Sequence, residues 1–296
     1  MKKTRIFVGS GAAVITPFAN DEIDFASFRK IIDFQIENYT KAIIVCGTTG
    51  ESAALSDYEH KKLISFAIEY VNGRVPVIAG TGSNSTARSL EMSRFAANEG
   101  ADALLVVTPY YNKTTQPGLV AHYFKIAETS GKPLMVYNVP SRTGLNILPE
   151  TYALLGEHEN IVAVKEANGN IAALAESLAA CAGSLDFYSG NDGEIVPFLA
   201  LGGMGVVSVM ANILPKQTSN ICELFFSGKI EESRKLQLSL TEICSALFCE
   251  TNPIPVKHAM KLMGYCNGEL RLPLIEIGEK HRGRLETAMR NAGIKI

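Results

Sequence analysis

The sequence predicts a (β/α)8 barrel followed by a C-terminal helical appendage. Three observations support this fold class. Apolar runs rich in β-branched residues recur along the chain, segments with helical spacing lie between them, and the length of 296 residues accommodates the about 250 that such barrels use. Nearly unbroken apolar runs are typical of strands covered on both faces. Their alternation with helices, at about 20 to 33 residues per unit, indicates parallel strands joined by right-handed crossovers.

Each element of the barrel has its own local signal. The helical segments open on Ser or Asn caps and two of them end in Gly, as helices in proteins often do. The clearest are SDYEHKKLISFAIEYV (56–71), STARSLEMSRFAANEG (85–100) and NIAALAESLAACAG (170–183). The predicted strands are AAVITPF (12–18), AIIVCG (42–47), VPVIAGTG (75–82), ADALLVVTPYY (101–111), KPLMVYNVP (132–140), IVAVKEA (161–167), LDFYSGND (185–192) and GVVSVMAN (205–212).

A doubly wound open sheet is the main alternative fold. Such sheets often carry a glycine-rich phosphate loop after the first strand, and SGAAVITPF supplies none. After residue 214 helical patterns replace the strand pattern, over 229–248, 252–264 and 274–293. Pro253 and Pro255 indicate a turn before one of these helices, because proline suits a first helical turn. We therefore expect a catalytic barrel over 1–225 and a helical region over 226–296.

Composition excludes several classes of function. The formal net charge is -2 and the basic residues are scattered, so neither nucleic acid nor an anionic membrane surface is an expected partner. No apolar run reaches the about 18 residues of a membrane span. The six cysteines form no C-x-x-C and the five histidines no H-x-x-x-H, so no metal site is predicted. We expect reduced cysteines and a cytoplasmic location.

The basic, apolar N-terminus admits a second interpretation as a secretory signal. It reads MKKTRIFVGSGAAVITPF, which lacks a clear A-x-A cleavage site and carries a proline at its end. The same residues are typical of a first strand, which is the interpretation we favour.

Lys165 stands at the end of the apolar run IVAVKEA, where the chemistry of a barrel is expected. Burial disfavours an ammonium ion and can make a lysine amine nucleophilic near neutral pH. Such an amine is suited to forming a Schiff base with a keto acid, and the iminium then acts as an electron sink. The alternative is structural: the lysine pairs with a neighbouring carboxylate and packs its aliphatic stem.

Other strand ends carry groups that this chemistry needs. Tyr137, one strand away, could move protons at oxygen, although a tyrosine there is more often a core residue. Thr48 and Thr49 could hold a carboxylate, or could simply stabilise a turn. Arg142 could bind a second carboxylate in bidentate fashion, although a lone loop arginine is often a solvated charge.

These motifs in this order resemble the dihydrodipicolinate synthases, which belong to the pyruvate-dependent class I lyases together with N-acetylneuraminate lyase. The resemblance covers nearly the whole chain. It rests on GTTGES, VIAGTGSNST, TPYYNK, YNVPSRTG, VAVKEANGN, GGMGVVSVMAN and NPIPVK.

The resemblance implies roles for particular residues. Lys165 would form the Schiff base with pyruvate, and Tyr137, Thr49 and Tyr111 would form a proton relay. In the family the Tyr111 position reaches a neighbouring subunit's site, which implies an oligomer, commonly a tetramer and in some members a dimer.

The resemblance also implies how the substrates are bound. Thr48 and Thr49 would hold the pyruvate carboxylate, Val207 would line the pocket through its backbone, and Arg142 would bind L-aspartate 4-semialdehyde. No cofactor is implied. Relatives acting on sugar acids usually lack an arginine in SRTG, so Arg142 favours the synthase over a keto sugar acid aldolase such as the N-acetylneuraminate enzyme. A third possibility is a non-catalytic ligand-binding barrel. It predicts that at least one of the chemical groups at Lys165, Tyr137, Thr49, Tyr111 and Arg142 is missing, and all five are present.

Some members of this family are inhibited by lysine at a subunit interface. Asp57 replaces a histidine of the inhibited pattern, and Arg88 replaces a glutamate that would meet the ammonium group of the effector. Because like charges repel, we expect weak or absent lysine feedback. The positions concerned are Ser52, Ala53, Asp57, His60, Asn84, Arg88 and Tyr110.

Overall fold

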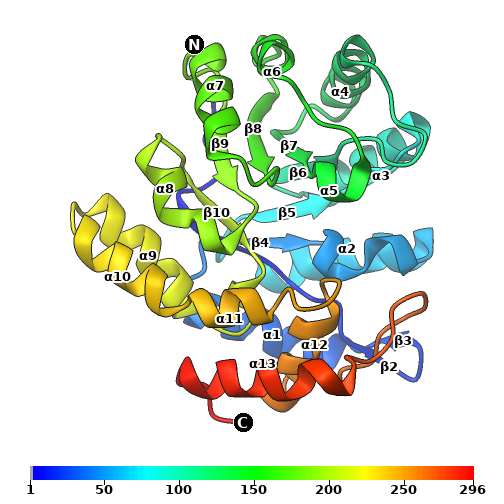
Figure 1. The fold of residues 1–296 in the computed structure, drawn as a ribbon. Coiled ribbons are helices and arrows are strands. Elements are labelled where there is room, and N and C mark those ends of the chain that lie inside the picture. The colour runs from blue at the N-terminus through cyan, green and yellow to red at the C-terminus, as the bar shows by residue number, and fades with distance from the viewer. Residues whose placement is uncertain (1–2) are drawn as a thin grey trace.

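Eight parallel strands close into a barrel in the computed structural model, which describes residues 3–296 (Figure 1). The order around the barrel is β1-β10-β9-β8-β7-β6-β5-β4, and β1 closes it by pairing with both β10 and β4. The fold class predicted from the sequence is thus confirmed. The strands are β1 (Gly9–Ala13), β4 (Ala42–Val45), β5 (Val77–Gly80), β6 (Ala103–Val107), β7 (Leu134–Asn138), β8 (Ile161–Glu166), β9 (Asp186–Ser189) and β10 (Gly205–Ser208).

The first strand begins earlier than the sequence prediction of 12–18. It starts at Gly9, and residues 14–17 leave the barrel toward an antiparallel hairpin of β2 (Phe18–Ala19) and β3 (Glu22–Ile23). A Cβ on Gly11 would lie 2.8 Å from Ile44 Cδ1 and 2.9 Å from Phe7 Cζ, so a larger residue there would have to displace these two side chains. Because glycine weakens the apolar signal of a strand, the pattern placed this strand too late.

Side chains alternate between two apolar regions, because successive residues of a strand point to opposite faces. One set fills the barrel interior, and the other packs between the strands and the helices. Met135, Ala163 and Val207 belong to the interior set, whereas Val136 and Val164 belong to the outer set. Along β8 the alternation is interrupted at Val162 and Ala163, which both belong to the interior set where the register with β7 is irregular. From Ala163 onward it places the residue after Val164 toward the barrel interior.

The helices between the strands begin at the caps that the sequence indicates. Ser56 and Glu59 form a reciprocal capping box at the start of α2, and Ser85 caps α3, which ends at Gly100 with φ 99°. The helices of the barrel are α1 (Phe25–Glu37), α2 (Asp57–Val71), α3 (Thr86–Glu99), α4 (Gln116–Ser130), α5 (Pro140–Thr143), α6 (Pro149–Leu155), α7 (Ile171–Cys181), α8 (Ile195–Ala200) and α9 (Pro215–Phe226). Short 3₁₀ turns are η1 (Thr48–Gly50), η2 (Ser52–Ala54), η3 (Asp192–Glu194) and η4 (Met210–Asn212).

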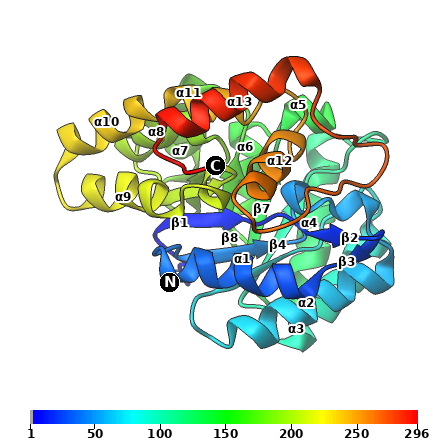
Figure 2. The same ribbon diagram turned by 90° about the horizontal axis from the view of Figure 1, so that it is seen from below.

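Four further helices follow the barrel. The run 229–248 divides at Leu240, which carries no glycine or proline signal, and the last helix begins at 279 instead of 274. Met260 and Leu285 belong to the same apolar cluster as the barrel's outer set, so the division at residue 225 stays a proposal. Figure 1 shows α12 and α13 at the same end of the molecule as α1 and the β2–β3 hairpin, and in Figure 2, which looks onto that end, α12 is drawn between α13 and α1. These helices are α10 (Ile230–Ser239), α11 (Thr241–Ala246), α12 (Ile254–Leu262) and α13 (Glu279–Asn291).

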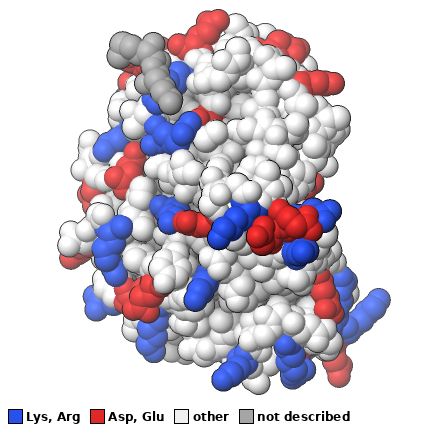
Figure 3. All heavy atoms as spheres, turned by 90° about the vertical axis from the view of Figure 1, so that its left-hand side faces the viewer, with Lys and Arg blue, Asp and Glu red and all other residues white. Residues whose placement is uncertain are grey.

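The surface carries both signs of charge. On the face drawn in Figure 3, Lys and Arg side chains lie beside Asp and Glu side chains in several places. Among residues 3–296, no helix combines the length and the apolar character that crossing a membrane requires.

Candidate active site

Lys165 lies in the barrel interior at the end of β8. Its residue exposure is 5%, and its Nζ lies 4.3 Å from the centroid of the Tyr137 ring. Tyr137 on β7 is the register partner of Lys165, and Tyr188 on β9 is the partner on the other side. Alternation along β8 explains the position, because Ala163, two residues earlier, also faces inward. The structure therefore brings together the two residues on which the predicted chemistry depends.

Val207 lies on β10 in the same interior cluster as Tyr137, and none of its surface is exposed. Its backbone belongs to the strand that closes the barrel against β1. A role through the backbone is compatible with this position, because the side chain is occupied by packing.

Asp192 is a buried carboxylate near this site that the sequence reading did not single out. It accepts hydrogen bonds from the Ser208 hydroxyl and from the backbone N–H groups of Val209 and Met210, the last at 2.8 Å. Burial raises its pKa, and these hydrogen bonds and the charge of Lys165 act in the opposite direction. Asp192 thus anchors the end of β10 to η3. The letters GND at a strand end were its only sequence signal.

Glu166 follows Lys165 and points away from the barrel interior. Its carboxylate accepts hydrogen bonds from the Tyr152 hydroxyl at 2.5 Å, from Asn138 Nδ2 at 2.9 Å and from the Asn168 backbone at 2.9 Å. Burial raises its pKa to about 6, although these donors oppose the change. The cluster ties β7, β8 and α6 together directly behind Lys165.

The Thr48–Thr49 turn is the 3₁₀ turn η1 after β4. Thr49 is buried, with 2% of its surface exposed, and its Oγ1 accepts a hydrogen bond from Asn252 Nδ2 at 3.0 Å. Thr48 is half-buried, and the Gly50 carbonyl accepts a bond from the Thr16 hydroxyl at 2.7 Å. The turn is therefore held from both the N-terminal and the C-terminal parts of the chain.

Arg142 lies on α5 and is exposed, and its Nη2 donates to the backbone carbonyl of Asn252 at 3.2 Å. It lines a cavity of about 350 Å³ together with Thr48, Val139 and Asn252. Lys165, Tyr137, Thr49 and Val207 do not line this cavity. The cavity nevertheless places a threonine hydroxyl and a guanidinium in one space.

The same cavity includes most of the positions that the resemblance associates with lysine inhibition. Asp57 and Asn84 are not in the lining, but Asp57 forms a salt bridge of 2.7 Å with Arg88. The lining members of this set are Ser52, Ala53, His60, Arg88 and Tyr110.

Tyr111 is not brought to the other predicted site residues. Its side chain is 91% exposed, and its φ of 68° lies in the left-handed region, which is uncommon for a residue other than glycine. Within residues 3–296, Tyr111 makes no contact that explains why an exposed tyrosine stands here.

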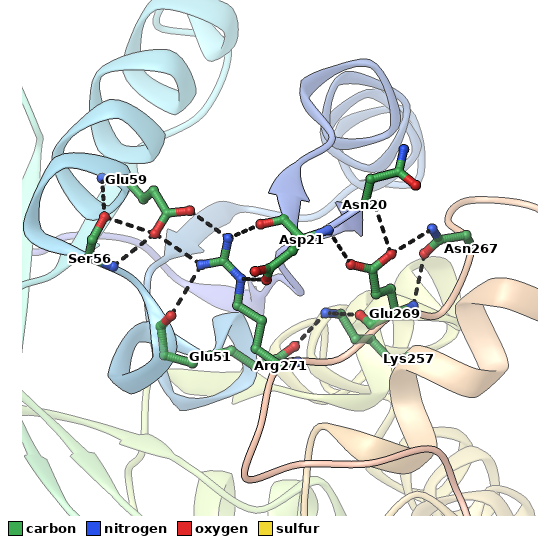
Figure 4. A network of polar contacts seen from close by, with 10 residues as sticks. Asn20, Asp21, Glu51, Ser56, Glu59, Lys257, Asn267, Glu269 and Arg271 are labelled. Atoms are coloured by element: carbon green, nitrogen blue, oxygen red, sulfur yellow. Dashed lines mark hydrogen bonds and ion pairs between the residues drawn. The ribbon is translucent and has the colours of Figure 1, made fainter.

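A buried ion pair joins the C-terminal region to the Thr48–Thr49 turn (Figure 4). Lys257 on α12 has no exposed surface and donates to the Glu51 carboxylate and to the Glu269 carbonyl, the latter at 2.6 Å. Its Nζ lies 4.1 Å from the centroid of the Phe18 ring. Burial lowers the pKa of Lys257, whereas Glu51 acts to raise it. Glu51 has φ 53°, so the ion pair holds a strained residue that directly follows η1.

Arg271 forms a second link that also involves Phe18. Its guanidinium lies 4.3 Å from the Phe18 ring centroid and donates to the Glu59 carboxylate at 2.5 Å and to Asp21 at 2.9 Å. The hydrogen bond from Arg271 lowers the pKa of Glu59 to about 2. Figure 4 shows these residues arriving from α2, the N-terminal hairpin and the loop before α13.

Comparison with known proteins agrees with this geometry. Residues 6–292 match the model of the Dihydrodipicolinate synthetase family. The chain belongs to this family. The family expected from the sequence motifs is thus confirmed, and the family members compared below align with nearly the whole chain.

Relatives in this family include the 4-hydroxy-tetrahydrodipicolinate synthase of Caldicellulosiruptor saccharolyticus. It is 53% identical over 292 residues, which cover 98% of this chain and 99% of that protein. The solved dihydrodipicolinate synthase of Thermotoga maritima has a TM-score of 0.96 at 44% identity, covering 98% of this chain and 99% of that one. That of Acinetobacter baumannii, solved with pyruvate, has a TM-score of 0.95 at 41% identity, covering 97% and 99%.

Titration of Glu166 makes the stability of the protein depend on pH. Its pKa is raised from 4.5 to about 6 on folding, so the stability that its protonated form contributes is complete below pH 4.5. That contribution is lost as the pH rises through about 6, and it amounts to about 2 kcal/mol. Urea unfolding from pH 4.5 to 7.5 should show this loss in the unmodified protein.

Glu166→Gln removes the titrating group and should flatten this part of the profile, although its amide leaves one donor of the cluster unpaired. Glu176→Gln, at an exposed position on α7, is the matched control and should retain the slope. Parallel pH profiles for the unmodified protein and Glu166→Gln would contradict the assignment.

Proposed function

We propose that this chain is a 4-hydroxy-tetrahydrodipicolinate synthase, which condenses pyruvate with L-aspartate 4-semialdehyde on the path to diaminopimelate and lysine. The observation that carries the proposal is the buried Lys165 amine beside the Tyr137 ring at the end of β8. The family match and the 53% identity to a protein with this name support the choice of reaction.

Lys165 acts as the nucleophile. Its neutral amine adds to the keto carbon of pyruvate, and the carbinolamine loses water to give an iminium ion. Removal of a proton from the methyl carbon gives an enamine, which adds to the aldehyde carbon as the aldehyde oxygen takes up a proton. The amine of the second substrate then adds to the former keto carbon, which closes the ring and releases Lys165.

Tyr137 moves protons at the carbinolamine and aldehyde oxygens, for which its place beside Lys165 is suited. Thr49 and Tyr111 extend the relay. Thr48 and Thr49 hold the pyruvate carboxylate, Arg142 binds the carboxylate of the semialdehyde, and Val207 lines the pocket through its backbone. The shared cavity of Thr48 and Arg142 supports a site with two carboxylate-binding ends.

The exposed Tyr111 fits the proposal that it completes the site of a neighbouring subunit. The active form is then an oligomer. We propose a homotetramer, which is common in the family. A dimer is the smaller form in which each subunit could still contribute Tyr111 to the site of the other. We also propose a cytoplasmic location, where the precursors of amino acids are made.

The direct test is condensation of pyruvate with L-aspartate 4-semialdehyde, followed by coupled reduction of the product. Lys165→Ala should lower kcat by about 10³-fold or more and abolish borohydride trapping of pyruvate, because the variant lacks the amine that we propose to form the iminium. Lys216→Ala, at an exposed position on α9, is the matched control and should leave both unchanged.

Covalent trapping at another lysine would move the site. Trapping at Lys165 without turnover of the semialdehyde would keep the Schiff-base chemistry and favour a keto sugar acid such as N-acetylneuraminate as substrate.

Lysine should be a weak inhibitor or none at all. The position that would meet its ammonium group carries the Arg88 guanidinium, and the nearby carboxylate of Asp57 is already paired with that arginine at 2.7 Å. Initial rates measured from micromolar to millimolar lysine should change little. Half-saturating inhibition at micromolar lysine would refute this prediction.

A further inference from the structure

Asn252 joins two groups that the proposed function assigns to opposite ends of the site. Its side-chain Nδ2 donates to Thr49 Oγ1 at 3.0 Å, and its backbone carbonyl accepts from Arg142 Nη2 at 3.2 Å. It is 5% exposed, and its Oδ1 is buried without a hydrogen-bond partner among the described residues. The sequence motif NPIPVK contains it, but neither the proton relay nor the carboxylate sites use it.

The polarity of the bond to Thr49 has a chemical consequence. An amide N–H can only donate, whereas a hydroxyl group can both donate and accept. Because the Thr49 oxygen receives the hydrogen of Asn252, its own hydrogen remains available for a different acceptor. An acceptor in place of Nδ2 would instead draw that hydrogen toward α12 and out of the relay.

Asn252 is held beside Thr49 by the contacts of its own segment. It directly precedes the residues that begin α12, and Lys257 on that helix forms the buried ion pair with Glu51. The segment 252–257 therefore contacts the segment 48–51 at two points, through Thr49 and through Glu51. Two contacts from one short segment fix the position of Asn252 beside Thr49, and its Nδ2 is the amide atom that bonds to the Thr49 hydroxyl.

We propose that Asn252 is a positioning residue that directs the Thr49 hydroxyl hydrogen into the proton relay while it holds Arg142 on the other side of the cavity. The inference rests on the proposed function, because it assigns Thr49 a proton to deliver. Asn252 itself touches neither substrate nor the reacting atoms in this account.

The test compares Asn252→Asp, which replaces the donor by an acceptor of the same shape, in the unmodified and Thr49→Val backgrounds. The readout is the rate of pyruvate trapping on Lys165 by borohydride, measured across pH. In the unmodified background the rate should fall by about 10- to 100-fold, because the Thr49 hydrogen is then held by the carboxylate. In the Thr49→Val background the same change should have no further effect, because no hydroxyl remains to be directed.

Asn220→Asp, at an exposed position on α9, controls for the added charge and should leave the trapping rate unchanged. Asn252→Ala replaces Asn252→Asp if the latter does not fold, with a smaller fall expected and the same dependence on Thr49. Equal losses in both backgrounds would show a merely structural role and overturn the inference.

The two proposals fail in different ways. If the unmodified protein does not trap pyruvate, the proposed function fails and this inference fails with it. If the unmodified protein traps pyruvate normally and Asn252→Asp traps it at the same rate, only the inference about Asn252 is overturned.

Discussion

The buried ion pair between Lys257 and Glu51 is the interaction on which the rest of the site depends. Both side chains are removed from water, so each charge requires the other, and the loss of one partner typically costs about 3–5 kcal/mol. The pair joins α12 to the residue that ends the Thr48–Thr49 turn. It does so against the face of Phe18, which the N-terminal hairpin supplies. Three distant parts of the sequence thus meet beside the carboxyl ends of the strands.

This arrangement gives the C-terminal helices a role beyond stability. A barrel interior can position Lys165 and Tyr137 by strand register alone, because both belong to paired, buried strands. The turn that carries Thr48 and Thr49 has no such ladder, and it relies on Lys257, Asn252 and Thr16 for its position. Rigid strands therefore hold the proposed nucleophile, while contacts with residues distant in sequence hold the groups that we propose to bind substrate.

The features that depend on local sequence pattern could be predicted from the sequence. Apolar runs indicated all eight strands, and Lys165 stood out because a charge ended such a run. The first strand was placed too late, since Gly9 and Gly11 at its start carry no apolar signal. Lys257, Glu51, Asp192 and Glu166 were not identified, because each is explained by a partner distant in sequence or on a neighbouring strand. The break at Leu240 also has no local signal.

The central claim is that the Lys257–Glu51 pair positions the Thr48–Thr49 turn for substrate and does not merely stabilise the fold. The decisive measurement compares unfolding free energy with kcat/KM for pyruvate in Lys257→Met and in the double variant Glu51→Leu/Lys257→Met. Apolar replacement of a whole buried pair is often neutral or stabilising, so the double variant should regain most of the stability that the single variant loses. Its kcat/KM should remain lower by about 10-fold or more. Recovery of both stability and kcat/KM in the double variant would contradict the claim.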